Sequence, residues 1–150
     1  HKLAPVKKVE LIHNDTDFTK HSIQGEPAIP SYIEQYGLGN QYFVSGRYVE
    51  AIKLLEQIDF SELSNTQKTH LIKLHAYALL NLGQYSRIIN ILTNDIDCDL
   101  GDELLFLLGI SSNALDNKKL ALQSFKKIID NYPNSEYQNS AKLQVRVLKR

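Results

Sequence analysis

A helix-turn-helix pattern that recurs along the chain constrains the fold more than any other feature. Apolar residues at helical spacing flank a turn at Gly46, and weaker copies of the pattern surround Gly83 and Asp116. These turn positions are 37 and 33 residues apart. A period of about 34 residues is typical of stacked helical hairpins, in which each pair of helices buries its apolar face against the next pair. The spacing therefore predicts an all-α repeat protein.

Capping signals and turn glycines divide the chain into seven expected helices. Three pairs of residues have capping-box spacing, in which each side chain of the pair satisfies a backbone N–H of the first helical turn. These pairs are Ser31 with Glu34, Ser64 with Gln67, and Ser135 with Gln138. Gly46 and Gly83 are expected to end helices, because glycine adopts a positive φ without steric cost. The expected helices span about 31–45, 48–59, 65–82, 85–94, 102–114, 118–131 and 136–149.

Residues 1–30 differ in composition from the helical region that follows. They contain three of the four prolines and show little helical periodicity. We expect an extended arm or linker, because such a stretch cannot bury enough apolar surface alone. The alternative is an arm that packs on the helical region or on a partner. The expected organisation is thus an arm at 1–30 and a helical domain at 31–150.

The residues at key positions resemble the tetratricopeptide-repeat family. That family has Leu-Gly-x-x-Tyr in the first helix of each repeat, and Ala-x-x-x-Phe followed by Pro in the second. The matching residues are Leu38, Gly39, Tyr42, Ala51 and Leu55 in the first unit, and Leu108, Gly109, Ala121, Phe125 and Pro133 in the third. The resemblance implies a right-handed solenoid of three repeats at about 32–65, 69–101 and 102–135, closed by a capping helix at 136–149.

Small residues recur where the helices of a pair should approach most closely. Gly39, Ala76 and Gly109 occupy this place in the three units, and a larger side chain there would push the helices apart. The second unit departs most from the family pattern, with His75 in place of Leu and Ile88 in place of Ala. We expect its packing to be looser or shifted.

The segment from Phe125 to Tyr137 is similar to the junctions between repeats in bacterial envelope tetratricopeptide proteins. The outer-membrane assembly lipoprotein and the Tol-Pal coordinator family are examples. This resemblance implies a location in the bacterial cell envelope or periplasm, and it leaves a cytoplasmic location open.

The resemblance also implies a binding groove, because the first helix of each repeat lines a concave surface in this family. The predicted groove residues are Tyr36, Asn40, Phe43, His70, Lys73, Tyr77, Asn81, Phe106, Ile110 and Asn113. Ile33, Val44 and Leu80 map beside them. Aromatic anchors with flanking amides can hold an extended segment or an amphipathic helix of a partner protein. Core packing is the alternative for each single residue, and residues 1–30 of this chain are a further candidate occupant.

The acidic cluster near residue 100 does not meet the requirements of a metal site. Asp95, Asp97 and Asp99 have the alternate spacing of a calcium loop. Leu100 stands where glycine is needed, and Phe106 stands where the bidentate glutamate should be. We therefore predict a solvated loop, with no metal and no cofactor.

Composition and the absence of catalytic motifs favour a protein-binding role. Lys plus Arg equals Asp plus Glu at 17 each, so no net charge draws the chain to nucleic acid. No apolar run approaches the roughly 18 residues of a membrane span. The sequence lacks a nucleophile elbow, a phosphate-binding glycine loop and a dinucleotide fingerprint. We predict a non-enzymatic scaffold that binds another protein. The alternatives are a chaperone-like module that shelters a partner and a regulatory domain of a larger enzyme.

Overall fold

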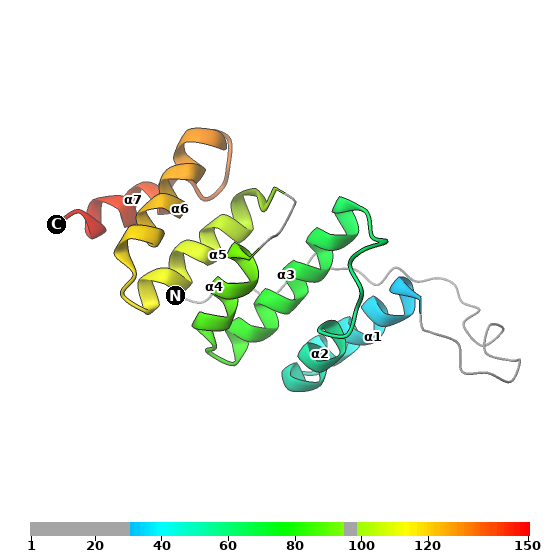
Figure 1. Cartoon of the computed structure of the whole chain (residues 1–150). Coiled ribbons are helices and arrows are strands. Elements are labelled where there is room, and N and C mark those ends of the chain that lie inside the picture. Colours follow the sequence, from blue (N-terminus) through cyan, green and yellow to red (C-terminus); the bar gives the residue numbers. More distant parts are fainter. Residues whose placement is uncertain (1–30, 95–98) are drawn as a thin grey trace, which may run out of the picture. The chain divides into compact units, whose positions relative to one another are not determined.

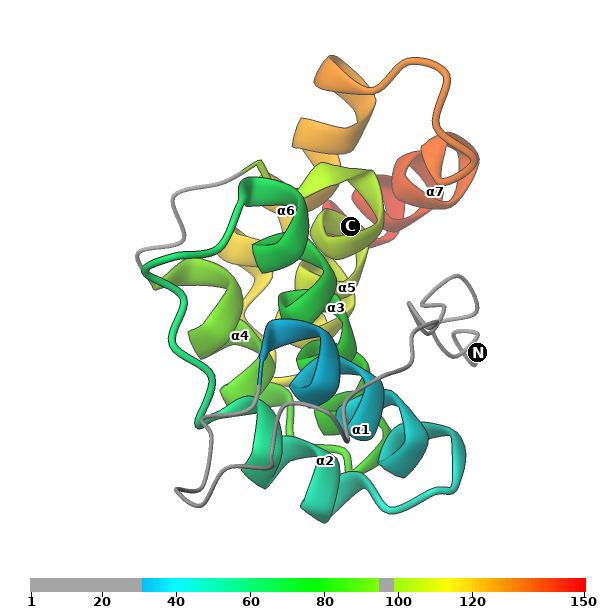
Figure 2. The same ribbon diagram turned by 90° about the vertical axis from the view of Figure 1, so that its right-hand side faces the viewer.

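The regular secondary structure is entirely α-helical in the part of the chain that the structure describes. The structure is a computed structural model, and it describes residues 31–94 and 99–150 (Figures 1 and 2). The helices are α1 (Tyr32–Val44), α2 (Tyr48–Leu55), α3 (Asn65–Asn81), α4 (Tyr85–Thr93), α5 (Gly101–Ala114), α6 (Lys118–Asn131) and α7 (Gln138–Leu148). The predicted all-α helical-repeat class is confirmed. The expected arm at residues 1–30 lies outside the described residues.

The described helices form two compact units, one ending at Leu82 and the other beginning at Gly83. In the first unit, α1 packs on α2 and α3, and α2 packs on α3. In the second unit, α5 packs on α4 and α6, and α6 packs on α7. The division assigns α3 and α4, which the sequence pairs in one repeat, to different units. The predicted extents of the three repeats stay a prediction.

The three turns that define the repeat share one backbone geometry. The turn residue has a positive φ in each, at 78° for Gly46, 68° for Gly83 and 61° for Asp116. The residue that follows has a φ of −92°, −94° or −90° and a ψ of 68°, 70° or 78°, respectively. The turn at Asp116 is therefore built like those at the two glycines, although an aspartate in this conformation is strained. The shared geometry supports the repeat register that the sequence predicts.

Two of the predicted capping pairs form, one completely and one in part. Gln67 N–H donates to Ser64 Oγ at 3.1 Å, and Ser64 N–H donates to Gln67 Oε1 at 3.0 Å, which completes the box. Glu34 N–H donates to Ser31 Oγ at 3.2 Å, but the Glu34 carboxylate accepts from the Ser31 hydroxyl instead of a backbone N–H. Serine therefore starts both α1 and α3 as predicted.

The predicted capping box at Ser135 is wrong, and α7 begins two residues later than expected. The Gln138 side-chain amide does not turn back to Ser135. It donates instead to the backbone oxygens of Ile128, Ile129 and Tyr132 at 2.9, 3.2 and 2.8 Å. Ile128 O also accepts from Tyr132 N–H, and Tyr132 O accepts from Ser135 N–H, so the Gln138 amide adds further bonds to carbonyls at the end of α6. Gln138 thus ties the start of α7 to the end of α6.

Helix α2 is shorter than predicted, ending at Leu55 and not near residue 59. Ile58 N–H donates to Leu55 O at 3.2 Å, so the chain leaves the α-helix through a tighter turn. Asp59 then accepts from Ser61 N–H at 2.9 Å, a local bond that favours a turn over a helix. Ile58 is buried, which explains why its apolar spacing suggested a longer helix.

The predicted close approach of paired helices is confirmed at both glycines. A Cβ atom on Gly109 would lie 2.5 Å from Phe125 Cε1, and one on Gly39 would lie 3.3 Å from Leu55 Cδ2. Both distances are to side chains of the paired helix. The contact of Gly109 with a buried aromatic ring is much tighter than that of Gly39 with a leucine terminus.

The strained turn predicts an unusual order of stability at Asp116. We expect the free energy of unfolding of Asp116→Gly to be about 1 kcal/mol higher than that of Asp116→Ala, because only glycine adopts this φ freely. Urea denaturation of the two variants measures the difference. At Gln123, an exposed position within α6, the order should reverse, with alanine favoured by about 0.5–1 kcal/mol. The same order at both positions would contradict the turn geometry.

The two close approaches predict unequal costs for one added methyl group. We expect Gly109→Ala to lower the free energy of unfolding by about 2 kcal/mol, because the Phe125 ring has to shift in a packed core. Gly39→Ala should change it by less than about 1 kcal/mol, because the Leu55 terminus can give way and alanine favours the helix. Thermal or chemical denaturation compares the two variants, and equal costs would refute the difference in packing.

Candidate protein-binding faces

The predicted groove residues of α1 lie in the interior of the first unit. Tyr36 is 1% exposed, and Asn40 and Phe43 are also buried. The Tyr36 ring stacks on Tyr32 at a centroid distance of 5.7 Å and lies 6.1 Å from the ring of His70 on α3. Tyr36 and Phe43 thus pack as core residues, which is the alternative that the sequence left open.

The predicted groove residues of α3 range from buried to exposed. Tyr77 is buried, His70 and Lys73 are half-buried, and Asn81 is exposed. Asn81 Nδ2 donates to Tyr77 O at 2.9 Å, one helical turn earlier. The ring contact between His70 and Tyr36 places this side of α3 against α1. On α3, therefore, His70, Lys73 and Asn81 are the predicted residues that a partner could reach.

In the second unit, the predicted anchor Phe106 is covered by other aromatic rings. It is 4% exposed, with its centroid 5.5 Å from Phe125 and 4.8 Å from Tyr137. Burial of the phenol raises the pKa of Tyr137 to about 12, and the nearby Glu103 carboxylate adds to this shift. Phe106 is therefore a core residue of this unit. Ile110 is half-buried and Asn113 is exposed, so they are the accessible predicted residues of α5.

Two of the accessible apolar residues of α1 lie on the predicted groove side of the helix. Ile33 is 40% exposed and Val44 is 71% exposed. Ile33, Asn40 and Val44 are seven and four residues apart, so they follow one side of the helix. We call these three residues the α1 stripe. It is the part of the predicted groove where apolar side chains reach the surface.

Asn40 lies at the centre of the α1 stripe with an unused hydrogen-bond acceptor. The residue is 5% exposed, and its Oδ1 atom is buried with no hydrogen-bond partner within the described structure. A buried polar atom without a partner costs about 1–3 kcal/mol, so native proteins rarely retain one. The sequence identified Asn40 as a groove residue but gave no sign that its carbonyl would lack a donor. A ligand that brings a hydrogen-bond donor to this atom would recover that cost.

The positive charge near the α1 stripe is carried by Lys73 and not by His70. Burial lowers the pKa of His70, and the positive charge of Lys73 lowers it further. His70 is therefore neutral at pH 7, and Lys73 carries the positive charge on this side of α3. This part of the unit consequently combines apolar contacts, an amide and one cation.

Neither a metal site nor a membrane span is found in the described residues. No group of three or more His, Cys, Asp or Glu side chains among residues 31–94 and 99–150 is arranged to hold a metal ion. Within the same ranges, no helix has the length and apolar character required to cross a bilayer. Asp95 and Asp97 of the acidic cluster discussed above lie outside the described residues.

Comparison with known proteins gives one family match, which covers part of the chain. The family model of the tetratricopeptide repeat matches residues 103–135. This range contains most of α5 and all of α6, the pair that holds Gly109 against Phe125. No curated protein and no solved structure matches the chain. Tetratricopeptide repeats generally mediate contacts between proteins through the surfaces of their stacked helices.

The environment of His70 predicts a measurable titration. We expect the imidazole of His70 to titrate below the ordinary pKa of 6.5, because burial disfavours its charged form. The unfolded chain then binds more protons, so the contribution of His70 to stability is lost as the pH falls below 6.5. Proton NMR of the ring gives the midpoint directly. Lys73→Ala should raise the midpoint without restoring 6.5, whereas Lys68→Ala in the same helix should not change it.

Proposed function

We propose that this chain is a non-catalytic module that binds a segment of another protein through the α1 stripe and the adjacent side of α3. The tetratricopeptide match at 103–135 supports a protein-binding role for the repeat. The observation that carries the proposal is the unpartnered Oδ1 of Asn40 between the exposed side chains of Ile33 and Val44.

The α1 stripe suits an extended segment of a partner. Ile33 and Val44 are eleven residues apart, about 16 Å along the helix axis, which is the length of about five residues of extended chain. The Oδ1 atom of Asn40 is buried, so the Asn40 side chain would rotate toward the segment and accept from one of its backbone N–H groups. Apolar side chains of the segment would contact Ile33 and Val44.

The buried aromatic residues support the helices that carry this face. Tyr36 and Tyr77 do not reach the surface, so their role is to fix the helices that present the stripe. The face is preformed in this proposal, and binding requires little rearrangement of the backbone. In the second unit, Ile110 and Asn113 on α5 form a smaller surface of the same chemical kind.

We also propose that the module acts as a scaffold in a complex of the bacterial cell envelope. The similarity of residues 125–137 to repeat junctions of bacterial envelope proteins supports this location. Fractionation of cells that express the full-length protein tests it, and recovery in the cytoplasmic fraction would refute it. A cytoplasmic location would leave the proposed binding face unaffected.

Substitutions in the α1 stripe test the proposed function. Peptides are selected on the wild-type protein from a random displayed library, and their affinities are measured by fluorescence anisotropy. We expect Val44→Glu to weaken binding at least about tenfold, because it places a charge in the apolar contact. Asn40→Leu should also weaken binding, yet it should raise the free energy of unfolding by about 1 kcal/mol because it removes the unpartnered carbonyl.

Val49→Glu is the matched control, because Val49 is an exposed valine on α2, outside the stripe. We expect its affinity to stay within about twofold of wild type. Equal losses in Val44→Glu and Val49→Glu would overturn the proposal. Selection of unrelated apolar peptides with no shared pattern would favour a chaperone-like module over a scaffold with a dedicated partner.

A further inference from the structure

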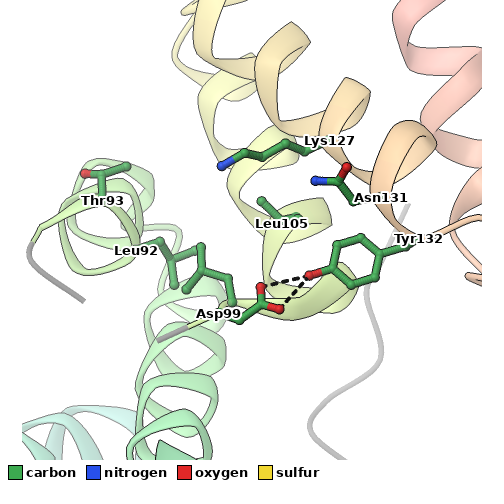
Figure 3. Close-up of a pocket in the computed structure, with 8 residues that line it drawn as sticks. Leu92, Thr93, Asp99, Leu105, Lys127, Asn131 and Tyr132 are labelled. Carbon is green, nitrogen blue, oxygen red and sulfur yellow. Dashed lines mark hydrogen bonds between the residues drawn. The ribbon is translucent and has the colours of Figure 1, made fainter. Parts of the chain in front are cut away.

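A hollow of about 290 Å³ lies in the second unit, beside α5. The end of α4, the residues before α5 and the last turns of α6 surround it (Figure 3). Leu105 lines the hollow, whereas the next residue, Phe106, packs on Phe125 and Tyr137. Successive residues of a helix point about 100° apart, so the hollow opens away from Phe106.

Three leucines form the apolar part of the lining, which we call the leucine floor. It consists of Leu92, Leu100 and Leu105, of which Leu92 and Leu105 are buried and Leu100 is half-buried. The volume lies just below the range of about 300–1,000 Å³ that ligand pockets occupy. A floor of this composition and size suits one apolar side chain and is too small for a helix.

Asp99 forms one wall of the hollow, and its carboxylate oxygens already accept hydrogen bonds. The Tyr132 hydroxyl donates to Asp99, with its oxygen 2.8 and 3.0 Å from the two carboxylate oxygens, and Gly101 N–H donates at 3.2 Å (Figure 3). Burial and the bond to Asp99 raise the pKa of Tyr132, so the phenol keeps its proton at neutral pH. The pair ties the residues before α5 to the end of α6 and gives the hollow a fixed wall.

The opposite wall carries donors without partners. Lys127 and Asn131 are exposed side chains one turn apart on α6, and neither makes a hydrogen bond or ion pair within the described residues. Figure 3 shows them on one side of Leu105 and Asp99 on the other. An ammonium and an amide at this spacing can both donate to a single anionic group. The hollow would therefore suit a ligand that has a hydrogen-bond acceptor for Lys127 and Asn131 next to an apolar group.

We propose that this hollow is a second docking point for a partner polypeptide, which seats one apolar side chain on the leucine floor and places a neighbouring carboxylate on Lys127 and Asn131. The proposal rests on the proposed function, since it requires a protein partner. A carboxylate fits better than a phosphate, because a phosphate would bring nearly two negative charges against the Asp99 wall. The predicted recognition unit is a leucine followed by an acidic residue.

The test uses nine-residue peptides with a central Leu-Glu in a Gly/Ser background, titrated into the isotope-labelled full chain and followed by amide chemical shifts. We expect saturable shifts at residues 92–94, 99–105 and 127–132. Peptides with Leu-Gln or Ser-Glu at the centre should bind at least about tenfold more weakly, because each lacks one of the two contacts.

Two neighbouring lysines provide the matched variants. Lys127→Glu should weaken binding of the Leu-Glu peptide at least about tenfold. Lys126→Glu should keep it within about twofold, because Lys126 is exposed on the same helix but does not line the hollow. Thr93→Trp, which fills the hollow from an exposed position, should also abolish the shifts.

The outcomes separate this proposal from the proposed function. Equal losses in the two lysine variants, or equal binding of the Leu-Gln peptide, would overturn the docking point. Shifts confined to α1 and α3 would also overturn it while leaving the α1 stripe as the binding face. Failure of the α1 stripe together with saturable binding at the hollow would instead refute the proposed face and retain the docking point.

Discussion

The close approach of paired helices at a glycine is the interaction on which the α1–α2 and α5–α6 hairpins depend. At Gly109 the space of the missing side chain is filled by the Phe125 ring, so α5 and α6 meet with almost no distance to spare. The Phe125 ring in turn contacts Phe106, which stacks on Tyr137 at the start of α7. One small residue thus determines how two further aromatic residues pack. A bulkier residue at 109 would separate the pair and disturb the support that α7 receives.

Much of this architecture could be predicted from the sequence because it depends on local chemistry. Positive φ at Gly46 and Gly83 follows from the freedom of glycine, and Ser64 with Gln67 satisfies the first turn of α3 through neighbouring residues. Asp116 could be aligned with the turn glycines only through the repeat period, since its side chain does not favour that conformation strongly. Gln138 was misassigned because its spacing from Ser135 fits a box, while its amide finds better acceptors at the end of α6. The competing partner lies in another helix, which local spacing cannot reveal.

The exposure of the predicted groove residues could not be predicted from the sequence, for a physical reason. Family mapping identifies which side of a helix faces the groove, but exposure depends on which neighbouring side chains fill the space. Tyr36 is buried against Tyr32 and His70, and Phe106 is buried beneath Tyr137. Tyr32 and Tyr137 were not among the predicted groove residues, so the predicted aromatic strip could not be recognised as core. The accessible surface consequently lies at Ile33 and Val44, at the margins of that strip.

The two proposed contact regions differ in what a partner would have to supply. At the α1 stripe, the unmet requirement is a donor for a buried carbonyl, which any backbone N–H can satisfy regardless of side chain. At the hollow, Asp99 already has its donors, and the unmet requirement is an acceptor for Lys127 and Asn131 beside an apolar floor. Backbone recognition tolerates many sequences. The hollow would discriminate, because a segment without a carboxylate leaves Lys127 and Asn131 unpaired and a segment without an apolar side chain leaves the leucines uncovered. Binding at the α1 stripe would therefore depend little on the sequence of the segment, whereas binding at the hollow would depend on it strongly.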